Sequence, residues 1–210
     1  MQREVLLSRI HADGPEDEVL ITCEQDSITR SSLKTLDPGT CLNDEIINFY
    51  LKNCLSNRET KKVMNDQAHK KNQCFFSTFF IQKLFQEKHT TKSERGKYYY
   101  DQKIQRWGRK QQKAFNKEKG FNVFAFRRLF FPRNIQNIHW GLVVVDFEQK
   151  TITYYDSMGG TERSYMEGIQ SYLQDQYMHF YKKDMDMKGW SLVMYPRGVL
   201  QQENSKCIGC

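Results

Sequence analysis

Two residues of this chain could form the acid–base part of a nucleophilic site, His139 and Asp156. They stand at the outer ends of two β-type runs, residues 139–146 and 151–156, joined by a tight turn over residues 147–150. In a hairpin whose turn centres near residue 148, positions whose numbers sum to about 295–297 face each other, and these two sum to 295. A carboxylate beside an imidazole fixes its tautomer and stabilises its protonated form. We therefore predict a His–Asp pair at the open end of a hairpin.

Such a pair orients a nucleophile, and the late cysteines Cys207 and Cys210 supply candidate thiols. The residues alone leave other interpretations open. His139 could be a hydrogen-bonded histidine at a strand end, and Asp156 a turn residue. A terminal Cys-x-x-Cys could be a redox pair or half of a metal site, although zinc needs a second pair of ligands. It also loosely fits a prenylation motif.

The elements that must position these residues indicate an α+β or three-layer α/β/α domain. A helix is predicted from Asn43, its N-cap, to about Leu55, and an apolar segment over residues 75–81 favours helix over strand. The strand at 139–146 is nearly continuous in apolar residues, so we expect burial on both faces. Further predicted elements are a strand at 19–23, a short helix at 30–36, strand-rich residues 121–131, a helix at 161–182 with Tyr165, Ile169, Tyr172 and Leu173 inward, and a strand at 190–194.

Composition and charge narrow the class of protein. The chain has 210 residues, 39% hydrophobic and 27% charged, which suits one domain or at most two small ones. Residues 1–26 contain a turn and charge cluster and are expected to be weakly ordered. No apolar run is long enough for a membrane span, and the first ten residues lack a signal peptide's apolar core. We therefore expect the protein to reside in the cytoplasm or nucleus. Much of the net charge of +7 lies in Lys70–Lys71 and residues 83–119, which indicates a solvated face or a nucleic-acid surface.

Several blocks together resemble one family, the SUMO-specific (sentrin-specific, ubiquitin-like) cysteine proteases. The similar blocks occur in the family's order over residues 27–210, which we take as one protease domain. They are Leu42-Asn43-Asp44-Glu45-Ile46-Ile47-Asn48-Phe49-Tyr50, Phe76-Ser77-Thr78-Phe79-Phe80, Trp107, His139-Trp140, Tyr154-Tyr155-Asp156-Ser157-Met158-Gly159-Gly160 and Gln201-Gln202-Glu203-Asn204. The resemblance implies a papain-like cysteine protease fold of the ubiquitin-like-protease type, with a central mixed sheet flanked by helices.

The resemblance also implies roles for particular residues. His139 would be the general base, Asp156 its orienting acid and Cys207 the nucleophile, while Gln202 would donate to the oxyanion hole. Trp140 would cover the substrate's C-terminal Gly-Gly. Asp44 and Phe76 would contact the body of the ubiquitin-like protein, although a helix-dipole carboxylate and ordinary core residues are the open alternatives for Asp44 and for the two aromatics. No metal or cofactor is implied. The expected partners are SUMO or a related ubiquitin-like protein and its conjugates. We expect a monomeric enzyme of the nucleus, and also of the cytoplasm, that binds neither a membrane nor nucleic acid.

Three departures from the family's pattern leave two functions open. Cys41 stands where the family has an aromatic before Leu-Asn-Asp, so a looser grip on the glycines is expected. Without a gap after Gln202, Ile208 takes the nucleophile's place, whereas a one-residue deletion makes Cys207 the nucleophile. The family continues past the position of Cys210, with the helix whose N-terminus carries the nucleophilic cysteine and with further helices. The comparison of patterns therefore leads us to expect that these C-terminal helices are missing here. We therefore retain two functional hypotheses. The first is an active SUMO protease, and the second is a catalytically dead, SUMO-binding pseudoenzyme or truncated product.

Overall fold

The computed structural model of the chain describes residues 2–56, 71–85 and 121–194. The predictions made for Trp107, Gln202 and Cys207, and for nearly all of the basic segment 83–119, lie outside the described residues. Among the residues that are described, no helix is both long enough and apolar enough to cross a membrane.

The N-terminal part consists of α1 (Gln2–His11), β1 (Val19–Cys23), β2 (Asp26–Thr29) and α2 (Arg30–Lys34). Within this part, the predicted strand at 19–23 is confirmed as β1, while the expectation of weak order for residues 1–26 stays a prediction. Arg30, the first residue of α2, holds the end of α1. Its buried guanidinium donates to the carbonyls of Ile10 and Ala12 at the end of α1 and pairs with the Glu18 carboxylate. One long-range cation therefore satisfies the unpaired carbonyls of a helix end.

The next helix, α3 (Asp44–Phe49), continues as a π-helical segment, η1 (Tyr50–Ser56). The Asn43 side chain accepts a hydrogen bond from the Ile46 N–H at 3.0 Å, so the predicted N-cap is confirmed. The Asn43 amide also donates to Ser32 Oγ at 3.0 Å, which ties α3 to α2. The predicted end near Leu55 matches the end of η1, but the last part of the segment is a π-helix.

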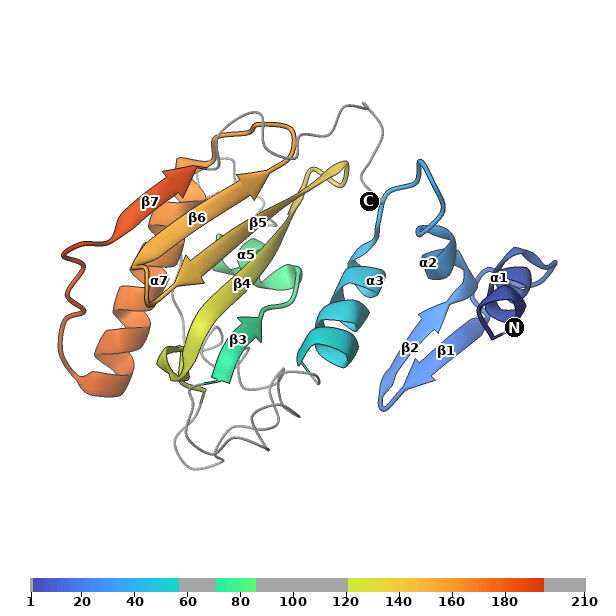
Figure 1. Ribbon diagram of the computed structural model, residues 1–210, viewed down its shortest axis with the longest axis horizontal. Coiled ribbons are helices and arrows are strands. Elements are labelled where there is room, and N and C mark those ends of the chain that lie inside the picture. Colours follow the sequence, from blue (N-terminus) through green and yellow to red (C-terminus); the bar gives the residue numbers. More distant parts are fainter. Residues whose placement is uncertain (1, 57–70, 86–120, 195–210) are drawn as a thin grey trace.

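The core of the fold is one five-stranded sheet of order β3-β4-β5-β6-β7 (Figure 1). The outer pairs β3·β4 and β6·β7 are parallel, and the inner pairs are antiparallel. The sheet is therefore mixed, as predicted. The strands are β3 (Lys71–Phe75), β4 (Phe126–Ile135), β5 (His139–Asp146), β6 (Thr151–Asp156) and β7 (Ser191–Met194); the associated helices are α5 (Phe79–Leu84), the 3₁₀ turn η2 (Val123–Ala125) and α7 (Arg163–Tyr181).

Both α5 and α7 pack on one face of the sheet (Figure 1). The inward residues predicted for α7 are all buried. Two expectations are corrected. The apolar run that favoured helix over residues 75–81 ends β3 at Phe75 and begins α5 only at Phe79. The expectation that β5 is buried on both faces is wrong: Val143 and Val145 are fully buried under the helices, whereas Leu142 and Val144 on the opposite face are only half-buried.

A four-residue turn, 147–150, sets the register between β5 and β6. Asp146 closes it, because its Oδ1 accepts hydrogen bonds from the N–H groups of Glu148 and Gln149, each at 3.0 Å. Its Oδ2 accepts from Arg128 Nε at 2.6 Å across the β4·β5 pair. Burial raises the pKa of Asp146, but the turn N–H groups and the Arg128 guanidinium outweigh burial and lower it overall.

This lowered pKa predicts an acid dependence of stability. Because the folded pKa lies below the unfolded value, the carboxylate stabilises the fold fully above about pH 4, and this contribution is lost as the pH falls through the folded pKa. We expect Asp146→Asn to lower the free energy of unfolding at neutral pH by about 1–3 kcal/mol and to flatten its decline in acid. Urea unfolding from about pH 7 to about pH 3 measures both.

Glu148→Gln is the matched control, since this carboxylate is mostly exposed and pairs with Arg127 at the surface. Its change should stay within about 1 kcal/mol. An Asp146→Asn protein with the wild-type acid slope would contradict the assignment.

Candidate active site

The open end of the β5–β6 hairpin holds a buried His–Asp pair. His139 is the first residue of β5 and Asp156 the last of β6. His139 Nε2 lies 2.6 Å from Asp156 Oδ1, and the two side chains are only 7% and 5% exposed. The contact predicted from the hairpin arithmetic is confirmed, while the catalytic roles of the two residues stay a prediction.

The register explains how the two side chains meet. Gly141 pairs directly with Asp156 in the ladder, so His139, two residues from Gly141 and on the same face of the sheet, is the diagonal neighbour of Asp156. Diagonal positions are about 7–8 Å apart, within reach of a ring on one side and a carboxylate on the other. The turn closed by Asp146 at the far end of the hairpin therefore determines which residues meet at its mouth.

Three donors from the described part of the chain surround the Asp156 carboxylate. Besides His139, the Met158 N–H donates to Oδ1 at 2.8 Å and the Tyr154 hydroxyl donates to Oδ2 at 3.1 Å. Burial raises the pKa of Asp156, but the bonds from His139, Met158 and Tyr154 outweigh it and lower the pKa overall. The carboxylate is therefore ionised at neutral pH and can only accept. It follows that Nε2 carries the imidazole proton and that Nδ1 is the ring nitrogen available to act as a base.

Trp140 connects this mouth to the block that begins α3. Its indole Nε1 donates to the Leu42 carbonyl at 2.9 Å, a contact across 98 sequence positions. The residue next to the predicted base is thereby held against the segment that leads into Asn43 and Asp44. Asp44 lies in the first turn of α3, and its Oδ1 is buried without a hydrogen-bond donor among the described residues. The predicted substrate contacts of Trp140 and Asp44 stay predictions.

Phe76 lies elsewhere, in the main core. Its side chain is 2% exposed, its ring stacks on Phe131 with centroids 4.3 Å apart, and it packs at a tilt against Phe80 with centroids 4.5 Å apart. These contacts favour the alternative interpretation of Phe76 as an ordinary core aromatic, because a side chain covered in this way offers almost no surface. Contact of Phe76 with a ubiquitin-like partner therefore stays a prediction without an exposed side chain to support it.

Sequence reasoning missed Tyr154, whose hydroxyl contacts the Asp156 carboxylate. A signal for it existed, because Tyr154 precedes Asp156 by two residues and so lies on the same face of β6. The Leu42 carbonyl, by contrast, left no signal in the sequence, since any residue carries a carbonyl.

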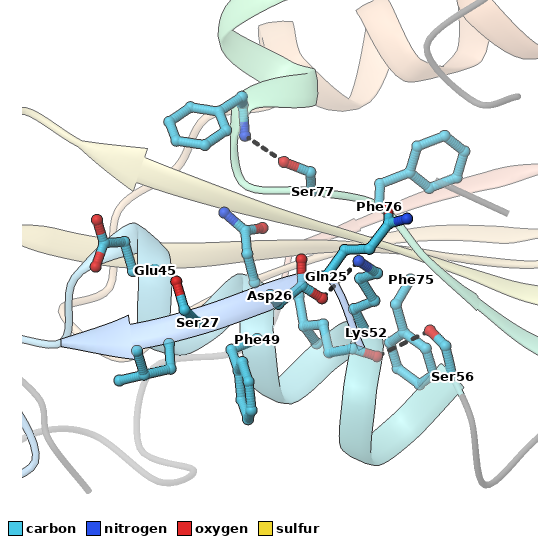
Figure 2. Close-up of a pocket in the computed structure, with 14 residues that line it drawn as sticks. Gln25, Asp26, Ser27, Glu45, Phe49, Lys52, Ser56, Phe75, Phe76 and Ser77 are labelled. Atoms are coloured by element: carbon cyan, nitrogen blue, oxygen red, sulfur yellow. Dashed lines mark hydrogen bonds and ion pairs between the residues drawn. The ribbon is translucent and has the colours of Figure 1, made fainter. Parts of the chain in front are cut away.

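A hollow of about 530 Å³ lies at a different place, between β2, the α3–η1 segment and the start of α5 (Figure 2). Neither His139 nor Asp156 lines it. Two polar contacts lie within its wall: Lys52 pairs with Asp26 at 2.5 Å, and Ser77 Oγ accepts from the Phe79 N–H at 3.3 Å. The hollow is therefore separate from the candidate site. Within the described parts of the chain, no three His, Cys, Asp or Glu side chains form a potential metal site.

Comparison with known proteins gives a consistent picture. The model of the Ulp1 protease family, C-terminal catalytic domain, matches residues 40–206. The chain is 33% identical over all of its 210 residues to human sentrin-specific protease 2, and 30% identical over 179 residues to ubiquitin-like-specific protease 1A of Arabidopsis thaliana. It spans about 30% of the length of these curated relatives.

Solved structures share the fold. The C-terminal Ulp1 protease domain in complex with Smt3, the yeast ortholog of SUMO, superposes with a TM-score of 0.62 at 25% identity, over 97% of this chain and 75% of that one. The SUMO protease Ulp1 with its catalytic cysteine oxidised to a sulfonic acid gives a TM-score of 0.65 at 22% identity, over the same shares of the two chains. The predicted fold, α+β with a mixed sheet and flanking helices, is confirmed.

Proposed function

Since the chain belongs to the Ulp1 protease family, C-terminal catalytic domain, we propose that it is a cysteine protease that cleaves after the C-terminal Gly-Gly of SUMO. The reaction would serve both deconjugation and precursor processing, because both break an amide at the same glycine carbonyl. The observation that carries the proposal is the buried His139–Asp156 pair at the mouth of the hairpin.

The geometry supports a definite division of roles. His139 Nδ1 takes the proton of the Cys207 thiol, and the thiolate attacks the glycine carbonyl. When the tetrahedral intermediate collapses, the C–N bond breaks and the imidazolium gives its proton to the departing lysine amine. Water, deprotonated by the same imidazole, then attacks the thioester, which releases the SUMO carboxylate and regenerates the thiol. Asp156 holds the ring in the Nε2–H tautomer and stabilises its charged form.

Other residues would bind rather than react. Gln202 donates an N–H to the oxyanion that forms on the glycine carbonyl. Trp140, which is anchored to the Leu42 carbonyl, covers the Gly-Gly segment and admits only residues without a Cβ. Asp44 contacts the body of SUMO. We further propose that the protein is monomeric, acts in the nucleus on SUMO and its conjugates, and binds no nucleic acid.

The direct test is turnover of a fluorogenic amide at the C-terminus of SUMO, with the same amide on ubiquitin as the specificity control. We expect hydrolysis of the SUMO substrate and a much slower reaction, or none, with ubiquitin. Equal rates on the two substrates would contradict the assigned partner, and the absence of SUMO hydrolysis would contradict catalysis.

A second candidate function is SUMO binding without cleavage. The observation that favours it is the sequence Cys207-Ile208-Gly209-Cys210, in which Ile208 takes the nucleophile's place when no gap follows Gln202. A SUMO vinyl-sulfone probe separates the two functions, because only a competent thiolate forms the adduct. Saturable SUMO binding measured by calorimetry without adduct formation would establish the second function, and adduct formation lost in Cys207→Ala would establish the first.

A further inference from the structure

The Asp156 carboxylate is linked to a second, deeper layer of polar side chains. Tyr154, 1% exposed, donates its hydroxyl proton to Asp156 Oδ2 at 3.1 Å. Arg133 on β4 is also buried, and its Nη1 lies 3.5 Å from the same hydroxyl oxygen. A chain of polar contacts therefore runs from Arg133 through Tyr154 to Asp156 and His139, over three adjacent strands.

The chemistry of the donors fixes the direction of this chain. A guanidinium has only N–H donors, so the Tyr154 oxygen accepts from Arg133 and its own proton points to Asp156. Burial and the nearby Asp156 charge raise the pKa of Tyr154, although Arg133 opposes them, and the phenol therefore stays a neutral O–H donor. Each donor in such a chain polarises the next.

The backbone leaves room for this arrangement at two glycines. A Cβ at Gly141, beside Trp140, would lie 2.7 Å from the Tyr154 hydroxyl oxygen. A Cβ at Gly160 would also collide with an oxygen of the Asp156 carboxylate, Oδ2. The side chains of Tyr154 and Asp156 thus occupy the space that these glycines leave open. An added methyl group would displace the phenol or rotate the carboxylate.

Arg133 is itself held in place. Its guanidinium carbon lies 3.5 Å from the centroid of the Tyr165 ring at the start of α7, and Nη1 lies 4.0 Å from Glu162 Oε1. The ring contact is a cation–π interaction at a buried position. Among the described residues, the charged and titratable groups in these contacts are Arg133, Glu162, Tyr154, Tyr165, Asp156 and His139.

We propose that Tyr154 and Arg133 are positioning residues for the His139–Asp156 pair. The Tyr154 hydroxyl fixes the rotation of the carboxylate, so that Oδ1 faces His139 Nε2 while Oδ2 faces the phenol. Arg133 keeps the hydroxyl oriented as a donor. The kinetic part of this proposal rests on the proposed protease function, whereas the structural part concerns the pair alone and can be tested without turnover.

The test compares Tyr154→Phe, which removes the hydroxyl and keeps the ring, with Tyr172→Phe, which alters another buried tyrosine outside the chain of contacts. The readout is the ¹³C titration of the Asp156 carboxyl, assigned with Asp156→Asn. Loss of a donor to the charged form is expected to shift the pKa of Asp156 upward in Tyr154→Phe and not in Tyr172→Phe. In Arg133→Met we expect a smaller upward shift. A wild-type titration in Tyr154→Phe overturns the proposal.

Two further measurements separate positioning from a merely structural role. The ¹⁵N signals of His139 report the share of the Nε2–H tautomer, which should fall in Tyr154→Phe. In SUMO amide hydrolysis, kcat should fall about tenfold with KM changed less than about twofold. If the wild type does not hydrolyse the amide, the protease function fails while the titration still decides the positioning role. Gly141→Ala, which displaces the hydroxyl rather than removing it, should shift the titration in the same direction and serves if Tyr154→Phe does not fold.

Discussion

Replacement of His139 by alanine is expected to lower kcat/KM for the SUMO C-terminal amide by about 10³-fold or more. The imidazole is the group that takes the thiol proton and later protonates the leaving amine, so its loss removes both proton transfers. KM should change little, because His139 is nearly buried and offers little surface for binding. Initial rates over a range of substrate concentrations, followed by fluorescence, provide the measurement.

His11→Ala is the matched control for this change. His11 lies at the end of α1 and is half exposed beside Asp37, away from the hairpin mouth. Its replacement should leave kcat/KM within about twofold of the wild type. A His139→Ala protein that keeps a rate within about tenfold of the wild type would remove His139 from the mechanism, whatever the rate of the control.

The largest expected effect on stability comes from Phe131 on β4. Its side chain is fully buried, and its ring contacts Phe76 at 4.3 Å, Phe80 at 5.5 Å and Tyr172 at 6.3 Å between ring centroids. Phe131 therefore joins the sheet to both α5 and α7. Truncation to alanine removes these contacts and leaves a cavity, so we expect Phe131→Ala to lower the free energy of unfolding by about 3–5 kcal/mol. The shift of the urea midpoint at constant m-value measures the loss.

Two further variants serve as controls for this prediction. Phe131→Leu retains much of the buried volume and should cost less than Phe131→Ala. Phe79→Ala removes a ring that is 40% exposed at the start of α5 and should also cost much less. Equal losses in Phe131→Ala and Phe79→Ala would mean that the contacts of Phe131 do not dominate this part of the core.

The His–Asp pair was predictable because its geometry is local. Residues 139–156 form one hairpin with a four-residue turn, and a turn determines the register of the strands that it joins. Arithmetic on residue numbers then suffices to bring His139 near Asp156. The N-cap at Asn43 and the inward face of α7 were predictable for the same reason, since capping and helical periodicity depend only on near neighbours in the chain.

The sequence did not reveal the contacts between distant segments. The turn and charge cluster in residues 1–26 gives no sign that a buried Arg30 binds the end of α1. The strand 139–146 reads as buried on both faces because it is apolar on both, yet the described helices α5 and α7 cover only one face. For Phe76 the sequence left core packing and substrate contact open, and the structure shows that its ring packs in the main core.

By itself, the sequence determined the family, the mixed α+β fold and the approach of His139 to Asp156, because motifs, strand alternation and a short turn are all properties of neighbouring residues. Only the tertiary structure decided that the Trp140 indole donates to the Leu42 carbonyl. It also decided that Arg133 contacts the Tyr154 hydroxyl, which in turn donates to the Asp156 carboxylate. These contacts join segments whose distance in space depends on how the sheet and helices pack. Which side chains become buried depends on how all of the helices and strands pack together, so no single stretch of residues specifies these contacts.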